Sequence, residues 1–77
     1  MIRTSPVFYD RSTDTMYITL REGRVTHTVP YDDRDYAVDF GEDGRPMGYE
    51  IQFASKHADV IVEALQILQR DNRAAAE

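Results

Sequence analysis

Apolar and polar residues alternate through the central part of the chain, from position 36 to position 53. A period of two is typical of a half-buried β-strand, because successive side chains point to opposite faces of the sheet. An Asp43-Gly44 pair divides the run, and Asp-Gly is a strong signal for a two-residue type I′ turn. The pattern therefore predicts a β-hairpin with one apolar row. The members of this row are Tyr36, Val38, Phe40, Met47, Tyr49, Ile51 and Phe53.

The position of the turn fixes which residues of the hairpin face each other. The predicted pairs are Phe40 with Met47, Val38 with Tyr49, and Tyr36 with Ile51. Directly opposed residues share a face, so the three apolar pairs lie on one side of the sheet. A loop that is one residue longer would send one apolar row to the other side.

Three further loops extend the sheet, at residues 11–14, at Glu22-Gly23 and at residues 32–35. Each loop places apolar residues opposite one another, with His27 as the exception on the apolar face. The predicted pairs are Tyr9 with Met16, Val7 with Ile18, Leu20 with Val25, Ile18 with His27, Met16 with Val29, Tyr31 with Tyr36, and Val29 with Val38. The strands form an antiparallel meander over about residues 7–53, in which the two strand prolines are expected to fray or bulge their strands.

After residue 53 the apolar period changes to that of a helix. Five residues follow the spacing i, i+1, i+4, i+5, i+8 of an apolar helix stripe, and they are Val60, Ile61, Ala64, Leu65 and Leu68. Ser55 is a suitable N-cap, so we expect a helix over about residues 56–71 and a frayed tail over residues 72–77. The predicted fold class is α+β. Residues 1–77 form a single domain, an antiparallel β-meander of about five strands with one C-terminal helix packed on one face.

The composition narrows the classes of function. Fourteen acids against nine bases give a net charge of −5, which disfavours direct binding to nucleic acid and leaves open a basic protein partner. There is no cysteine, so disulfides and thiolate chemistry are excluded, as suits a reducing cytoplasm. The first ten residues lack the apolar core of a signal peptide, and no run is long enough for a membrane span. We expect a cytoplasmic protein.

The predicted sheet is wider than one helix can cover. Five strands at about 4.8 Å spacing give a sheet roughly 24 Å across, whereas a helix with its side chains is about 10 Å wide. Large exposed apolar patches are uncommon on soluble monomers. We therefore expect a homodimer or a tightly bound partner.

Two strings of residues carry a resemblance to a known family. The first contains Tyr9-Asp10, Asp14, Tyr17-Ile18 and Leu20, and the second contains Val38-Asp39, Asp43-Gly44, Gly48, Glu50-Ile51 and Ala54-Ser55. Together they resemble the small bacterial family called domain of unknown function 2283, over about residues 9–55. The chain departs from the usual pattern at Gly41, at Pro46 and in its longer C-terminal helix. The resemblance implies a short single-domain protein without an established activity or known catalytic residues. Toxin-like or antitoxin-like gene neighbours in the family imply a partner-binding role.

The candidate interaction surface lies on the face opposite the apolar row. Asp39 and Glu50 are diagonal neighbours there, and Tyr17 is an aromatic residue on the same face. Paired carboxylates can share a proton or bind a cation, although two acids on a solvated sheet are usually solubilising charge. Because Asp39 lies opposite Gly48, its carboxylate also has room to bond local backbone or Tyr17.

No other residues form a recognisable catalytic, cofactor or metal pattern. His27, on the apolar face, fits a hydrogen-bonded core histidine or a pH-sensitive contact in a dimer. His57 lies thirty positions away, without the spacing of a metal site, and the serines lack a neighbouring base. The sequence favours a non-enzymatic interaction or regulatory module, of which an antitoxin-like protein is one form. The alternative is a small ligand-binding or minimal enzymatic domain that uses Asp39 and Glu50, with Tyr17, in a dimer cleft.

Overall fold

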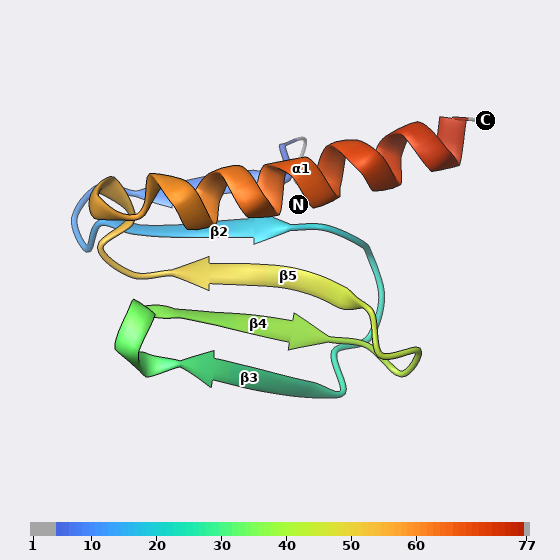
Figure 1. Ribbon diagram of the computed structural model, residues 1–77, viewed down its shortest axis with the longest axis horizontal. Helices are drawn as coiled ribbons and strands as arrows, with labels where there is room; N and C mark the ends of the chain where they lie inside the picture. Colours follow the sequence, from blue (N-terminus) through green and yellow to red (C-terminus); the bar gives the residue numbers. More distant parts are fainter. Residues whose placement is uncertain (1–4, 77) are drawn as a thin grey trace.

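The computed structural model describes residues 5–76, and the side chains of residues 5–72. A five-stranded antiparallel sheet carries one long helix on one face, which confirms the α+β class (Figure 1). The strands are β1 (Val7–Asp10), β2 (Thr15–Thr19), β3 (His27–Tyr31), β4 (Tyr36–Phe40) and β5 (Pro46–Ile51). Two single-turn helices, η1 (Asp32–Arg34) and η2 (Ala54–Lys56), precede β4 and the helix α1 (Ala58–Ala76). No helix within residues 5–76 is long and apolar enough to cross a membrane.

The strand order is β1-β2-β5-β4-β3, so the predicted pairing of β2 with β3 is wrong. Met16 lies opposite Ile51 and Ile18 opposite Tyr49, in β5. Both β3 and β5 offer an apolar row with a period of two, and the period alone does not distinguish them. The row of β5 is almost fully buried, with Ile51 at 0% exposure, whereas β3 lies at the edge and is mostly exposed. Greater apolar burial favours β5 as the neighbour of β2.

The other predicted registers are confirmed, apart from the pair next to the β4–β5 turn. The confirmed pairs are Val7 with Ile18, Tyr9 with Met16, Tyr31 with Tyr36, Val29 with Val38, Val38 with Tyr49, and Tyr36 with Ile51. Two hairpins and their loops were therefore readable from local alternation. The apolar row of β4 and β5 faces α1, as a half-buried sheet requires.

The β4–β5 turn lies where the sequence predicts it, but its type is different. Phe40 faces Pro46 and not Met47, with an irregularity of the register at this point. Of the two central residues Asp43 and Gly44, only Gly44 has a positive φ, of 78°, whereas a type I′ turn needs a positive φ at both. The amide of Gly44 donates to the carbonyl of Gly41 at 3.0 Å, and the amide of Gly41 donates to the carbonyl of Arg45 at 3.1 Å. The loop is therefore one residue longer than the predicted one, and a bulge in β5 restores the apolar face.

The helix starts later and ends later than predicted. Phe53 has a left-handed φ of 52°, and the chain makes the turn η2 before α1 begins at Ala58. Ser55 lies in η2 and its side chain bonds elsewhere, so it is not the N-cap. The C-terminal alanines favour helix, and α1 continues to Ala76 where a frayed tail was predicted. The last residue of that tail, Glu77, lies outside the described residues.

The core lies between α1 and the centre of the sheet, where the helix packs chiefly on β5 and β2. Its largest fully buried side chains are those of Ile18, Ile51 and Val60. The buried cluster consists of Ile18, Leu20, Val38, Tyr49, Ile51, Ala54, Val60 and Ala64. α1 lies over the β1–β2 side of the sheet, whereas β3, at the far edge, stays mostly exposed (Figure 1).

A candidate interaction groove on the outer face of the sheet

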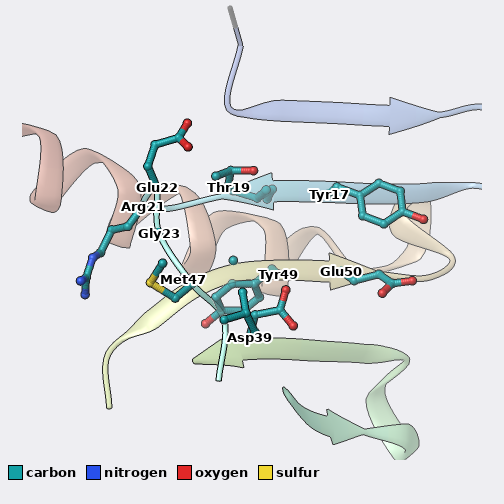
Figure 2. A pocket seen from close by; sticks show the side chains of 12 residues that line it. Tyr17, Thr19, Arg21, Glu22, Gly23, Asp39, Met47, Tyr49 and Glu50 are labelled. Carbon is teal, nitrogen blue, oxygen red and sulfur yellow. The ribbon is translucent and has the colours of Figure 1, made fainter. Parts of the chain in front are cut away.

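The outer face of the sheet, opposite α1, is hollowed by a groove. The connection from β2 to β3, residues 20–26, crosses over β5 on this face because β2 and β3 are not neighbours (Figure 2). The connection and the strands beneath it enclose about 370 Å³. The polar side chains of the groove come from Tyr17, Thr19, Arg21, Glu22, Asp39 and Glu50. The crossover, which the sequence analysis missed, therefore turns a flat sheet face into a concave one.

The structure brings the three predicted surface residues to this groove. Tyr17 in β2 lies directly opposite Glu50 in β5, and its side chain is 38% exposed. Asp39 in β4 lies opposite Gly48, which is two residues from Glu50 along β5 and on the same face. Figure 2 shows the Asp39 and Glu50 side chains on the same side of the sheet as the Tyr17 ring. The aromatic ring and the two carboxylates thus line one concave surface.

Asp39 has a partner that the sequence analysis did not identify. The Thr28 hydroxyl, across the β3–β4 ladder, donates a hydrogen bond to Asp39 Oδ1 at 2.6 Å. The sequence analysis considered a bond from Asp39 to local backbone or to Tyr17. The structure instead shows this bond between strands. One carboxylate oxygen is held by Thr28, and Asp39 Oδ2 lies 3.9 Å from the point where a side chain on Gly48 would begin.

Gly48 forms the floor of the groove between β2 and β4. A Cβ atom at this position would lie 3.0 Å from the carbonyl oxygen of Ile18. That separation is tighter than most real Cβ contacts, so any larger residue would have to push β2 away, and the close approach of β2 and β5 favours glycine here. The absent side chain also leaves the space between Thr19 and Asp39 open.

The charge of the groove is predominantly acidic. Glu22, Asp39 and Glu50 line it together with one base, Arg21. Arg21 Nη2 lies 2.9 Å from Asp43 Oδ2, and this hydrogen bond holds the pKa of the Asp43 carboxyl below its usual value. Because Arg21 is already paired with an acid outside the groove, it offsets little of the negative charge inside it.

The two histidines lie apart from the groove. His27 is exposed and stacks on Phe40, with ring centroids 5.2 Å apart, so it is not a core histidine. His57 Nε2 lies 3.1 Å from Asp35 Oδ2, in a contact between the helix start and the β3–β4 connection. Within the described part of the chain, no group of three or more histidine or acidic side chains is placed to hold a metal ion.

A second polar cluster, which the sequence analysis missed, joins the β1–β2 loop to the start of η2. Asp14 accepts hydrogen bonds from the Tyr9 hydroxyl at 2.7 Å and from the Ser55 hydroxyl at 2.7 Å. The backbone amides of Ala54 and Ser55 also donate to Asp14. The pKa of Asp14 lies below its usual value, first because of the bond from Ser55 and then because of the bond from Tyr9. The signal available in the sequence was that all these residues belong to the two family strings.

Two other acids of the family strings also serve to shape loops. Asp10 accepts bonds from the Ser12 amide at 3.0 Å and from the Ser12 hydroxyl at 2.7 Å, which shapes the β1–β2 loop. Asp43 accepts a bond from the Arg45 amide at 3.1 Å in the β4–β5 turn. Glu50, by contrast, is exposed and points into the groove.

Comparison with known proteins agrees with this pattern. No curated protein and no solved structure matches the chain. The family model described as "Protein of unknown function (DUF2283)" matches residues 7–55, which is more than half of the chain and spans all five strands. The chain therefore belongs to the DUF2283 family.

Proposed function

We propose that this protein is an interaction module that binds a basic segment of a partner protein in the outer-face groove. The observation that carries the proposal is the concave surface of about 370 Å³ in which Tyr17, Asp39 and Glu50 lie together under the β2–β3 connection. Concave sites with a few convergent polar groups are where proteins most often bind ligands. An acidic groove on a chain of net charge −5 favours a cationic ligand.

The chemistry of the groove suits an arginine side chain. A guanidinium group can donate two parallel hydrogen bonds to a carboxylate, which Glu50 offers. The same planar group can stack on an aromatic ring such as that of Tyr17, worth about 0.5–1 kcal/mol at an exposed site. Both groups are open to solvent, so salt will weaken the attraction and will slow association.

The test is a nuclear magnetic resonance titration of the ¹⁵N-labelled chain with a short arginine-rich peptide. We expect the backbone amide signals of Tyr17, Gly48 and Glu50 to shift, and the shifts to shrink at high salt. Glu50→Gln should weaken binding several-fold. Glu42→Gln removes an exposed acid in the β4–β5 turn and should leave binding unchanged. Equal losses of affinity in the two variants would show that only the net charge matters and would overturn the groove as the binding site.

A second candidate is a small ligand-binding or minimal enzymatic domain that uses Asp39 and Glu50. The groove favours it, since a formed hollow contains both acids. We place it second because Asp39 is already bonded to Thr28 and because the residues lining the groove include no histidine, cysteine or lysine to act with it. A small cationic ligand that binds as tightly as the peptide would favour this candidate.

We also propose that the module acts as a homodimer in the cytoplasm. The helix covers only part of the apolar sheet face, which supports self-association, and the lack of cysteine suits a reducing compartment. Light scattering at micromolar concentration should give twice the mass of 8.9 kDa. An antitoxin-like or regulatory role, in which an acidic module neutralises a basic partner, is one form that this function would take.

A further inference from the structure

The β3–β4 side of the sheet carries a row of aromatic and aliphatic side chains on the face that α1 packs against. Residues that face each other in the β3–β4 ladder share a side of the sheet, and Val38 of this ladder belongs to the core under α1. His27, Val29, Tyr31, Tyr36 and Phe40 therefore point to the same side as the helix, and we call them the aromatic face. Tyr31 is 38% exposed, and Val29, Tyr36 and Phe40 are half-buried.

The side chains of the aromatic face are held in place before any partner binds. The Tyr31 and Tyr36 rings stack with centroids 4.8 Å apart and 18° between their planes. Tyr36 stacks in turn on Tyr49, at 5.9 Å and 8°, and the Arg34 guanidinium lies 5.6 Å from the centroid of the Tyr36 ring. Aromatic groups that are already ordered lose little entropy on binding, which is a property of good interface anchors.

The chain exposes more surface than a compact monomer of its mass. The accessible surface is 5667 Å², whereas a compact monomer of 8.9 kDa exposes about 4,800 Å². The excess of about 850 Å² is close to the ~800 Å² that each partner contributes to a standard interface. The part of α1 that extends past the sheet supplies some of this surface (Figure 1), and we assign the rest to the aromatic face in the proposal below.

The edge of the sheet is a poor site for association, in contrast to its face. β3 forms one edge, and Pro30 in the middle of this strand has no amide hydrogen to donate to an added strand. β1 forms the other edge and has only four residues. Pairing that extends the sheet edge to edge is therefore disfavoured at both ends, and packing face to face remains.

We propose that a second copy of this chain covers the aromatic face, in a two-fold interface in which Val29 and Tyr31 lie against the same residues of the second copy. This inference rests on the self-association proposed above and names its surface. No member of the aromatic face is an acid, so two chains of net charge −5 can meet there without directly opposed carboxylates. A basic partner would be drawn instead to the acidic groove on the opposite side of the sheet.

Two valine substitutions test the interface. Val29→Glu places a charge in the middle of the aromatic face, whereas Val62→Glu places the same charge on α1 at a valine that is 50% exposed. We expect light scattering to give a dimer for the unmodified chain and for the Val62 variant, and a monomer for the Val29 variant with an unchanged circular dichroism spectrum. If the unmodified chain is a monomer at 100 micromolar, the proposed self-association is wrong.

Cysteine variants make the test independent of whether Val29→Glu folds. The chain has no cysteine of its own, so a single Val29→Cys substitution provides one thiol per chain. Under mild oxidation we expect most of the Val29→Cys protein to become a disulfide-linked dimer, and Val62→Cys to stay largely unlinked. If the chain is dimeric but Val29→Cys links no faster than Val62→Cys, the interface is wrong while self-association stands.

Discussion

The carboxylate of Asp14 accepts a hydrogen bond from the Ser55 hydroxyl at 2.7 Å, across 41 positions of the sequence. This contact ties the loop between the first two strands to the segment that leads into the helix. Asp14 itself has a left-handed φ of 53°, and its carboxylate also holds the Tyr9 hydroxyl. One side chain thus joins the first hairpin to the segment that follows β5.

We expect Asp14→Asn to lower the thermal midpoint of unfolding, because an amide oxygen is a weaker acceptor than a carboxylate. Asp33→Asn is the matched control, since Asp33 is an exposed acid of η1, and it should leave the midpoint unchanged. Circular dichroism melts of the two variants provide the measurement. Equal midpoints for both would mean that the Asp14 cluster does not contribute to stability.

The same carboxylate should make stability depend on pH. Its pKa in the folded chain lies below the ordinary value of 3.8 because Ser55 and Tyr9 donate to it. A carboxyl group with a depressed folded pKa contributes stability that is present above its unfolded pKa and is lost as the pH falls through the folded pKa. We therefore expect the difference in stability between the unmodified chain and Asp14→Asn to shrink below about pH 4. Urea unfolding at pH 6, 4 and 2.5 measures this difference, and a constant difference would contradict the prediction.

Gly48→Ala should destabilise the fold by about 1–3 kcal/mol, the range typical of overpacking against fixed backbone. The added Cβ would lie 3.0 Å from the Ile18 carbonyl oxygen, and a shift of β2 would disturb the core because the Ile18 side chain is fully buried there. Gly44→Asn is the control, because nothing lies within 4 Å of that position and asparagine tolerates the positive φ there. Urea unfolding should show a smaller loss for Gly44→Asn than for Gly48→Ala. The reverse order would contradict the close approach of β2 and β5.

Tyr49→Phe should lower stability by about 1 kcal/mol, the net value of an ordinary hydrogen bond. The Tyr49 hydroxyl donates to Glu63 Oε2 at 2.7 Å and so links the sheet to α1. Burial, and then Glu63, raise the pKa of Tyr49 well above its usual value. A tyrosine with a raised folded pKa stabilises the fold below pH 10 and loses that contribution as the pH rises further. In an alkaline titration followed by ultraviolet absorbance, Tyr49→Phe should therefore remove the last tyrosine to ionise.

The sequence predicted the local pairings because each is decided by a short loop and an apolar alternation. The β1–β2 and β3–β4 registers are of this kind, and both are confirmed. The neighbour of β2 was not predictable in this way, since β3 and β5 present similar apolar rows. Only the three-dimensional burial of Ile51 and Tyr49 under α1 selects β5.

The sequence predicted which residues belong to the candidate site, but it did not predict that the site is concave. Tyr17, Asp39 and Glu50 share a face because of strand alternation, which the sequence displays directly. The hollow around them depends on residues 20–26, which a tight β2–β3 turn would have kept away from this face. The role of Ser55 was not predictable either, because this residue is suited to cap a helix but bonds to the distant Asp14.

The pairing of β2 with β5 determines the order in which the chain can assemble. The hairpin of β1 and β2, and the three strands β3 to β5, each close over short loops at little entropic cost. Joining the two units requires contact between residues more than thirty positions apart, such as Met16 and Ile51. Contacts at such separation slow folding. We therefore expect the pairing of β2 with β5 to be the slow step of folding, after which the helix can pack on a complete sheet.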